Sequence, residues 1–328
     1  MKIMIYGAGA TGCVLAAKLV CTGAELTLVA RGAHGKALKE HGLRVITPVR
    51  EDRFQLHVVE HPEEAGVQDM VFITTKAYSM AEIAPHIPAL LHSDTRVIPV
   101  CNGVPWWFLF GLDGPLKDRP LTCLDPENVI RKHIPFAQVI GGVIYMAAAL
   151  RAPGITTSDA PPRCIIGAPD GTPTPHTNHL AAILQEAGFK DQQSTNIRAA
   201  IWRKLSWNIA FNPLGVLHRL PSAALAEDPE IREHARAIIA EHKQVGEALG
   251  LHATIDADEQ IMLAERAGMH KPSMLQDFEA GKTLETEALV GTVVEIAGML
   301  DISENTSKSQ LSKAKAMLRR MLEKSLAS

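Results

Sequence analysis

A glycine-rich hexapeptide near the N-terminus is the feature that most limits what this chain can fold into. It lies between a β-like run, Lys2–Tyr6, and a helix-like run, Cys13–Cys21. In this context the pattern G-x-G-x-x-G favours a dinucleotide-binding turn, with amides at the helix start facing the phosphates. The alternative is a glycine-rich turn of another α/β fold. The predicted cofactor-binding turn comprises Gly7, Ala8, Gly9, Ala10, Thr11 and Gly12.

The residue after the second predicted strand, Glu25–Ala30, indicates which dinucleotide is bound. A Rossmann domain that selects NAD usually carries an acidic residue there, which binds the ribose hydroxyls. Arg31 holds that position in this chain. Since a guanidinium suits a 2′-phosphate, Arg31 predicts NADPH, with a solvated loop arginine as the alternative. His34 and Lys36 could assist the phosphate, although ordinary surface positions are the simpler interpretation of both.

Two later strand-like runs are followed by polar side chains. Met70–Thr74 leads to Lys76, and Arg96–Cys101 leads to Asn102. The carboxyl ends of strands line the ligand crevice of an open α/β sheet, so both side chains are candidates for contact with cofactor or substrate. Asn102 precedes a glycine, which makes an ordinary turn an equal alternative.

A polar stripe interrupts the apolar helical segment Ile197–His218. Lys204, Asn208 and Asn212 recur every fourth residue, so they share one face of a helix. A buried ammonium or amide is costly unless it finds partners, and a buried stripe would therefore need a functional reason. The alternative is the solvated face of an ordinary amphipathic helix.

Strand signals stop after Ser194, and only helical patterns follow. The change predicts an α/β Rossmann-type dinucleotide-binding domain over residues 1–193 and an all-α C-terminal domain over residues 194–328. The other predicted helices in this half are Pro229–Leu249, Asp256–Ala267, Thr283–Leu300 and Ser307–Leu326. Apolar positions suited to either a core or a homodimer contact are Leu289, Val293, Ile296, Leu311 and Leu318.

Composition removes several classes of function. The 328 residues include 33 basic and 36 acidic side chains, a net charge of -3, so no basic field favours nucleic acid. Five cysteines without a C-x-x-C pair and fourteen histidines without ligand spacing predict neither disulfides nor a metal site. The longest later apolar run, Val139–Leu150, is shorter than the ~20 residues of a membrane-spanning helix. We expect a cytoplasmic protein without a membrane partner.

In combination, these motifs resemble the ketopantoate reductase (2-dehydropantoate 2-reductase) family over nearly the whole chain. Six signatures occur in the family's order: GAGATG from Gly7, Arg31, TKA at Lys76, CNGV at Asn102, IWRKLSWNIAFNPL around Lys204 and PSMLQDFEAGKTLETEALVG from Pro272. The resemblance implies NADPH-dependent reduction of 2-dehydropantoate to pantoate in pantothenate (vitamin B5) biosynthesis. The chain departs from the family at Ser222, where an asparagine is expected, and in a long stretch, Trp106–His133.

The resemblance also implies individual roles. Lys204 would be the general acid, and Glu285 would orient and support its charge. Lys76 and Asn102 would reach the nicotinamide ribose and the substrate from the Rossmann side. The implied substrate-binding residues are Asn102, Asn208, Asn212 and Ser273.

The chemistry of a 2-oxo acid substrate agrees with these roles. Hydride transfer turns a ketone into an incipient alkoxide, so the site needs a proton donor near that oxygen. A lysine with its ordinary pKa of about 10.4 is protonated at neutral pH; partial burial would lower that pKa, and Glu285 would oppose the shift. Two alternatives stay open: a reductase of another 2-oxo or β-hydroxy acid, and a non-catalytic NADPH sensor, which would need no donor such as Lys204.

Overall fold

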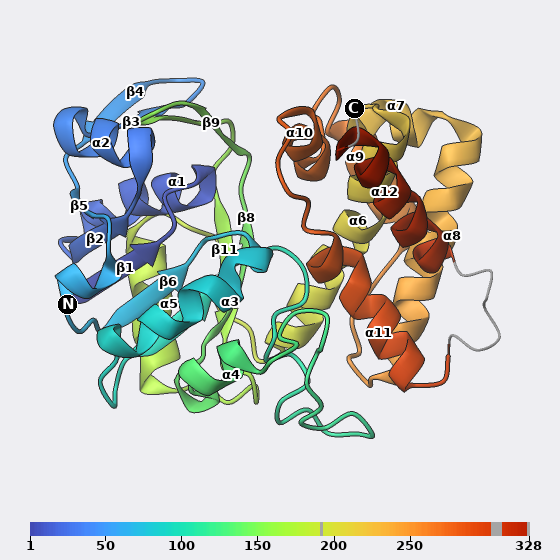
Figure 1. Ribbon diagram of the computed structural model, residues 1–328, viewed down its shortest axis with the longest axis horizontal. Helices are drawn as coiled ribbons and strands as arrows, with labels where there is room; N and C mark the ends of the chain where they lie inside the picture. The colour runs from blue at the N-terminus through green and yellow to red at the C-terminus, as the bar shows by residue number, and fades with distance from the viewer. Residues whose placement is uncertain (191–192, 303–309, 327–328) are drawn as a thin grey trace. The chain divides into compact units, whose positions relative to one another are not determined.

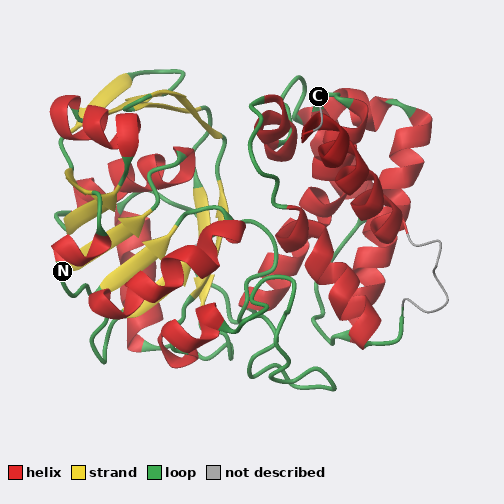
Figure 2. Ribbon diagram, viewed as in Figure 1, coloured by secondary structure: helices red, strands yellow, loops and turns green. Residues whose placement is uncertain are grey.

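The chain forms two compact units in a computed structural model that describes residues 1–190, 193–302 and 310–326. Met1–Cys101 and Glu127–Ile197 make up the first unit, and Asn102–Pro126 and Arg198–Ser328 the second. Within the described residues, every named strand belongs to the first unit, and the second unit is helical (Figures 1 and 2). The predicted fold class is confirmed. The boundary at residue 193 stays a prediction, and Asn102–Pro126, expected in the N-terminal half, belongs to the helical unit.

The first unit is built around a parallel sheet with strand order β5-β2-β1-β6-β7. Strands β2 and β5 extend the sheet on one side of β1, and β6 and β7 extend it on the other side. The topological switch point therefore lies between β1 and β6. Ile3, Met4 and Ile5 are fully buried although neighbouring side chains point to opposite faces, which requires cover on both faces. The strands are β1 Lys2–Tyr6, β2 Glu25–Val29, β5 His57–Val59, β6 Met70–Ile73 and β7 Arg96–Pro99.

Two smaller sheets complete the strands of this unit. One has the order β4-β3-β10-β9, and the other pairs β11 with β8 in antiparallel fashion. Helix α1 contacts β1 and β2 as well as β3, β9 and β10, so it lies between the parallel sheet and the four-stranded sheet. These strands are β3 Leu43–Ile46, β4 Glu51–Phe54, β8 Gly141–Tyr145, β9 Ala148–Ala152, β10 Ile155–Ser158 and β11 Arg163–Gly167.

The helices of the first unit begin where the local sequence allows it. Thr174 caps α5, because its side chain accepts a hydrogen bond from the Thr177 amide, and Pro175 needs no amide partner at the first helical position. Helix α1 begins three residues earlier than the expected Cys13, directly after Gly9. The helices are α1 Ala10–Leu19, α2 Gly32–His41, α3 Met80–Ile83, α4 Val129–His133 and α5 Pro175–Glu186.

The second unit consists of helices around α6. Asp228 and Asp256 cap α8 and α9, since each carboxylate accepts hydrogen bonds from two amides of the first turn. The predicted helix Thr283–Leu300 is in fact a π-helical turn, Glu287–Gly291, followed by α11. Residues 307–309 of the last predicted helix lie outside the described residues. The helices are α6 Ile197–His218, α7 Ser222–Glu227, α8 Pro229–Ala248, α9 Ala257–Arg266, α10 Ser273–Glu279, α11 Thr292–Met299 and α12 Gln310–Leu326.

The apolar residues that could have served either a core or a homodimer contact belong to the core of the second unit. Leu289, Val293, Ile296, Leu311 and Leu318 are all buried within this single chain. The aromatic stretch after Pro105 joins the same unit, where Trp107 and Phe108 are fully buried and Phe108 stacks on Trp202 at 5.6 Å. In the described part of the chain, no helix is both long and apolar enough to cross a membrane.

Candidate active site

The glycine turn after β1 is shaped by close backbone contacts. Gly7 has a φ of +121°, which strongly favours glycine, and a Cβ on Gly12 would lie 1.9 Å from the Gly7 carbonyl oxygen. The Thr74 hydroxyl, at the end of β6, donates a hydrogen bond of 2.6 Å to that same oxygen. The turn is thereby fixed to both strands that flank the switch point.

Gly9 leaves the start of α1 open. It is the N-cap residue of this ten-residue helix, and its own lack of a side chain leaves the first-turn amides without a side-chain cap. A Cβ at Gly9 would meet no described atom within 4 Å. The uncapped amides at the positive end of the helix dipole can therefore bind an anionic group.

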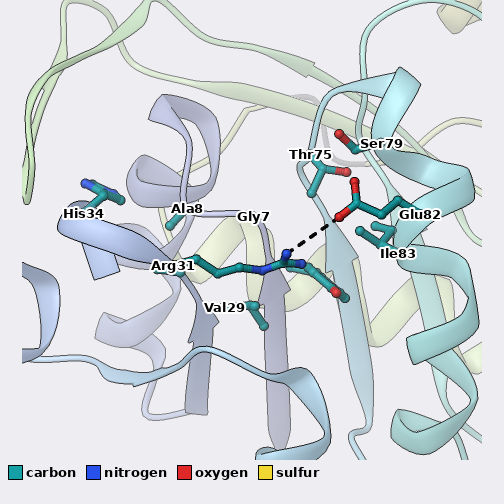
Figure 3. A pocket seen from close by; sticks show the side chains of 11 residues that line it. Gly7, Ala8, Val29, Arg31, His34, Thr75, Ser79, Glu82 and Ile83 are labelled. Atoms are coloured by element: carbon teal, nitrogen blue, oxygen red, sulfur yellow. Dashed lines mark ion pairs between the residues drawn. The ribbon is translucent and has the colours of Figure 1, made fainter. Parts of the chain in front are cut away.

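A cavity of about 330 Å³ opens beside this turn, at the carboxyl ends of β1, β2 and β6 (Figure 3). The Thr75 hydroxyl is buried there and has no hydrogen-bond partner among the described residues. Buried polar atoms are normally paired, so this hydroxyl can form a hydrogen bond with a ligand. Burial raises the pKa of the Tyr6 phenol, and hydrogen bonding with Arg31 and the positive charge of Arg31 oppose that shift.

Arg31 contributes a positive charge to the cavity wall. It lies two positions after the last residue of β2, precedes α2 as its N-cap, and has its Nη1 atom 3.7 Å from Oε1 of Glu82 (Figure 3). Lys36 points elsewhere: it is exposed on α2 and pairs with Glu40 at 3.9 Å.

His34 also lines the cavity, but its ring serves the local structure. Its Nδ1 accepts a hydrogen bond of 3.0 Å from the Gly154 amide, and its Nε2 lies 3.5 Å from the Cys13 sulfur. Burial lowers the pKa of His34, so the ring is neutral at neutral pH. Among the described lining residues, Arg31 is therefore the one cation available for a phosphate.

Lys76 lies directly after Thr75, where a short 3-10 turn begins. Thr75 lines the cavity and Lys76 is not among its described lining residues. The sequence correctly placed Lys76 just beyond β6, and its contact with a ribose stays a prediction.

In the second unit, the structure brings Lys204 and Asn102 together. The Lys204 ammonium donates a hydrogen bond of 2.8 Å to Oδ1 of Asn102. Asn102 lies on a turn that packs against the chain near Ala288: the Val104 amide donates to the Ala288 carbonyl oxygen at 3.0 Å, and a Cβ on Gly103 would be only 2.2 Å from that oxygen. A glycine is therefore required beside Asn102.

The rest of the polar stripe on α6 is buried. Asn208 is 9% exposed and Asn212 is fully buried, which excludes a solvated face at these positions. Oδ1 of Asn212 accepts hydrogen bonds from the Ser273 hydroxyl at 3.4 Å and from the Met274 amide at 3.3 Å. Its Nδ2 is a buried donor without a partner among the described residues, so this amide can donate to a ligand.

Glu285 and Ser222 occupy different environments. Glu285 is 6% exposed and immediately precedes the helical turn whose Ala288 supports the Asn102 turn. Ser222 is fully buried, and both its hydroxyl and its amide donate to the His270 carbonyl oxygen at 3.0 Å. Ser222 therefore attaches α7 to the chain before α10, and its correspondence to an asparagine of the family stays a prediction.

Several residues of the site were missed by the sequence analysis. Tyr6, Thr75 and Glu82 line the cavity, and the signal available was their position at the end of a strand or in the helix that follows it. Arg198 was also missed: it is buried, and its guanidinium donates to the carbonyl oxygens of Phe108 and Phe110. The described residues contain no group of three or more side chains that could hold a metal ion.

Fold and site together define a class, the nicotinamide-dependent oxidoreductases that join a Rossmann domain to a helical domain. Residues 3–171 match the family Ketopantoate reductase PanE/ApbA, and residues 196–312 match its C-terminal domain. The chain belongs to the ketopantoate reductase family, which confirms the resemblance inferred from its motifs.

Individual relatives agree with this assignment. The chain is 39% identical over 302 residues to the 2-dehydropantoate 2-reductase of Mesorhizobium japonicum, covering 92% of this chain and 93% of that protein. A crystal structure provisionally described as a ketopantoate reductase of Ralstonia solanacearum MolK2 is 30% identical, with a TM-score of 0.91 over 98% of both chains. A D-mandelate dehydrogenase in a ternary structure with NADH and anilino(oxo)acetate shares the fold, with a TM-score of 0.82, 23% identity and 99% coverage of both chains.

Proposed function

We propose that this protein is an NADPH-dependent 2-dehydropantoate 2-reductase that converts 2-dehydropantoate to pantoate. The observation that carries the proposal is the hydrogen bond from Lys204 to Asn102. Lys204 lies on α6, and the other two residues of its polar stripe, Asn208 and Asn212, are buried. A paired lysine beside buried amides provides a proton donor and orienting groups, which a ketone reductase needs. The relative from Mesorhizobium japonicum, which is named for this reaction, supports the choice of substrate.

The residues of the first unit fit a phosphorylated nicotinamide dinucleotide. The turn Gly7–Gly12 and the first amides of α1 would hold the pyrophosphate, and Arg31 would hold the 2′-phosphate. The unpaired hydroxyl of Thr75 adds hydrogen-bonding capacity in the same cavity. We assign Lys76 to the nicotinamide ribose. Such a cofactor, when bound, supplies the hydride.

Lys204 supplies the proton. As the substrate carbon is reduced, its oxygen gains negative charge, and the Lys204 ammonium gives a proton to that oxygen, completing the hydroxyl group. Asn102 accepts a hydrogen bond from the ammonium and fixes its position at 2.8 Å. Glu285, a buried carboxylate, stabilises the lysine as a cation before the transfer. A proton from water restores the ammonium after product release.

The amides and hydroxyl near the end of the stripe bind the substrate. Asn212 has an unpaired buried Nδ2 donor, and the Ser273 hydroxyl lies next to its Oδ1. Asn208 is one helical turn closer to Lys204 on the same face. These neutral groups can orient the carboxylate and the 4-hydroxyl of 2-dehydropantoate without adding charge to the site.

The proposal also places the reaction in a reducing, cytoplasmic compartment. The five cysteines form no disulfide bonds among the described residues, and Cys13 and Cys164 are buried. This setting agrees with a chain that does not use disulfides for its stability.

A panel of 2-oxo acids tests the proposal. Purified protein is mixed with NADPH and either 2-dehydropantoate or 3,3-dimethyl-2-oxobutanoate, which lacks only the 4-hydroxyl group. We expect NADPH oxidation with the highest kcat/KM for 2-dehydropantoate and a loss of about tenfold or more for the analogue, because a site built to bind a hydroxyl discriminates against its absence. Faster turnover of another 2-oxo acid would identify a reductase of that acid instead. NADPH binding without turnover of any carbonyl compound would identify a sensor.

A further inference from the structure

A second charge faces Arg31 in the cofactor cavity. Glu82, on the short helix α3, lines the same cavity, and its Oε1 lies 3.7 Å from Nη1 of Arg31. Figure 3 shows the two side chains extending toward each other from α3 and from the end of β2. Both are more than half exposed, at 70% and 56%, so neither is locked in place by packing.

The other titratable groups around this pair leave the balance of charge unchanged. The Tyr6 phenol, which forms a hydrogen bond with Arg31, and the His34 ring are both neutral at neutral pH, because burial raises the pKa of Tyr6 and lowers that of His34. Glu63 contributes its charge to the surroundings of Tyr6, but it is held by His86, with Oε1 and Nδ1 2.5 Å apart. At the cavity wall, one positive charge therefore faces one negative charge.

We propose that Glu82 is a specificity-determining residue that limits the preference of this enzyme for NADPH over NADH. The proposal rests on the function proposed above, in which Arg31 binds the 2′-phosphate. That phosphate carries nearly two negative charges, so it must displace the Glu82 carboxylate from Arg31 or bind next to it. Either event weakens NADPH binding relative to a site with Arg31 alone.

The same carboxylate favours NADH. NADH has a 2′-hydroxyl in place of the phosphate, and Rossmann domains commonly bind that hydroxyl with an acidic side chain after the second strand. This chain has Arg31 at that position, whereas Glu82 comes from α3, which follows β6. Glu82 on α3 thus supplies a carboxylate acceptor, which the position after β2 lacks in this chain.

A structural role for Glu82 predicts the opposite result. If the carboxylate only orients Arg31 toward the phosphate, removing its charge should weaken NADPH binding. If it competes with the phosphate, removing its charge should strengthen NADPH binding. The sign of the change in affinity therefore distinguishes the two roles.

The experiment measures dissociation constants of NADPH and NADH by fluorescence titration of the full-length wild-type protein, Glu82→Gln and Glu25→Gln. Glu25 is the matched control, because it starts β2 at the opposite end from Arg31 and pairs with Lys2 at 3.9 Å. We expect Glu82→Gln to bind NADPH about three- to tenfold more tightly and NADH about twofold or more weakly, with a smaller difference at high salt. Glu25→Gln should bind both as the wild type does. Unchanged or weaker binding of NADPH by Glu82→Gln would overturn the proposal.

Binding is measured without 2-dehydropantoate, so a failure of this inference is distinguishable from a failure of the proposed function. A wild-type protein that binds NADPH but gains nothing from Glu82→Gln contradicts only the role of Glu82. A wild-type protein that binds neither dinucleotide contradicts both proposals.

Discussion

The ammonium of Lys204 lies 2.8 Å from Oδ1 of Asn102, although 102 positions of sequence separate the two residues. Both belong to the second unit, since the chain enters that unit at Asn102 and returns to it at Arg198. The contact of Gly103 and Val104 with Ala288 fixes the turn that carries the asparagine. The lysine is therefore oriented by a residue that the sequence pattern alone would place at the end of the Rossmann sheet.

Removing the acceptor tests this orientation. Asn102→Ala should lower kcat by about ten- to hundredfold, because a hydrogen bond to a charged group is worth about 1.5–3 kcal/mol. Asn102→Asp retains an acceptor oxygen and should keep more of the activity than the alanine variant. Steady-state kinetics with NADPH and 2-dehydropantoate measure both, and equal activity of Asn102→Ala and wild type would rule out the positioning role.

We expect Arg31 to control the discrimination between the two nicotinamide dinucleotides. Arg31→Ala should raise the KM for NADPH by more than the KM for NADH, because only NADPH has a 2′-phosphate to lose a partner. Lys36→Ala removes a cation from the same helix region but outside the cavity, and it should change neither value. Equal changes for both cofactors in Arg31→Ala would argue against the 2′-phosphate site.

Gly9 and Gly12 should respond differently to alanine. A Cβ at Gly12 would overlap the Gly7 carbonyl oxygen, so Gly12→Ala should lower the Tm by several degrees or prevent folding. A Cβ at Gly9 meets no described atom within 4 Å, so Gly9→Ala should keep a Tm near that of the wild type and bind NADPH more weakly. Thermal unfolding and cofactor titration measure these effects. Tight NADPH binding by Gly9→Ala would show that no phosphate approaches this backbone.

His242 should make the protein less stable at acidic pH. It is fully buried on α8, its ring stacks on Trp202 at 4.3 Å, and burial lowers its pKa to about 4. In the unfolded chain its pKa is about 6.5, so between pH 6.5 and 4 only the unfolded chain binds the proton. The stability that is present above pH 6.5 is therefore lost progressively as the pH falls to 4.

Urea unfolding at pH 7 and pH 5 measures this loss. Between pH 7 and pH 5, protonation of His242 in the unfolded chain should lower the free energy of unfolding of the wild type by about 2 kcal/mol. His242→Gln should lack this contribution to the pH dependence. His179→Gln, at an exposed position, is the control and should behave as the wild type. An identical pH dependence of the wild type and His242→Gln would show that His242 is not responsible.

Local patterns in the sequence predicted much of the fold. The bounds of β1 and α6 agree with the prediction, because a short apolar strand before glycines and a long periodic helix are strong local signals. Strand β10 has the sequence ITTS, and α7 and α10 have six and seven residues, so these elements were too polar or too short to recognise. They form because the surrounding structure packs against them.

Regular spacing in the sequence drew attention to two parts of the candidate site. The four-residue repeat on α6 marked a helix face whose two asparagines are buried, and the glycine pattern marked the turn between β1 and α1. Glu82 and Thr75 could not be found in this way, because they approach Arg31 and Tyr6 only through the pairing of β6 with β1. Likewise, Asn102–Pro126 joins the helical unit through contacts such as those of Arg198 with Phe108, which no local pattern shows.

The most direct test of the central claim is the turnover of Lys204→Ala at saturating NADPH and 2-dehydropantoate, compared with the wild type and Lys204→Arg. Loss of the general acid should lower kcat by about 10²- to 10⁴-fold while the dissociation constant of NADPH stays close to that of the wild type. Lys204→Arg keeps a cation but is a poor proton donor, so it should not restore turnover. Wild-type turnover in Lys204→Ala would contradict the assignment of this lysine as the proton donor.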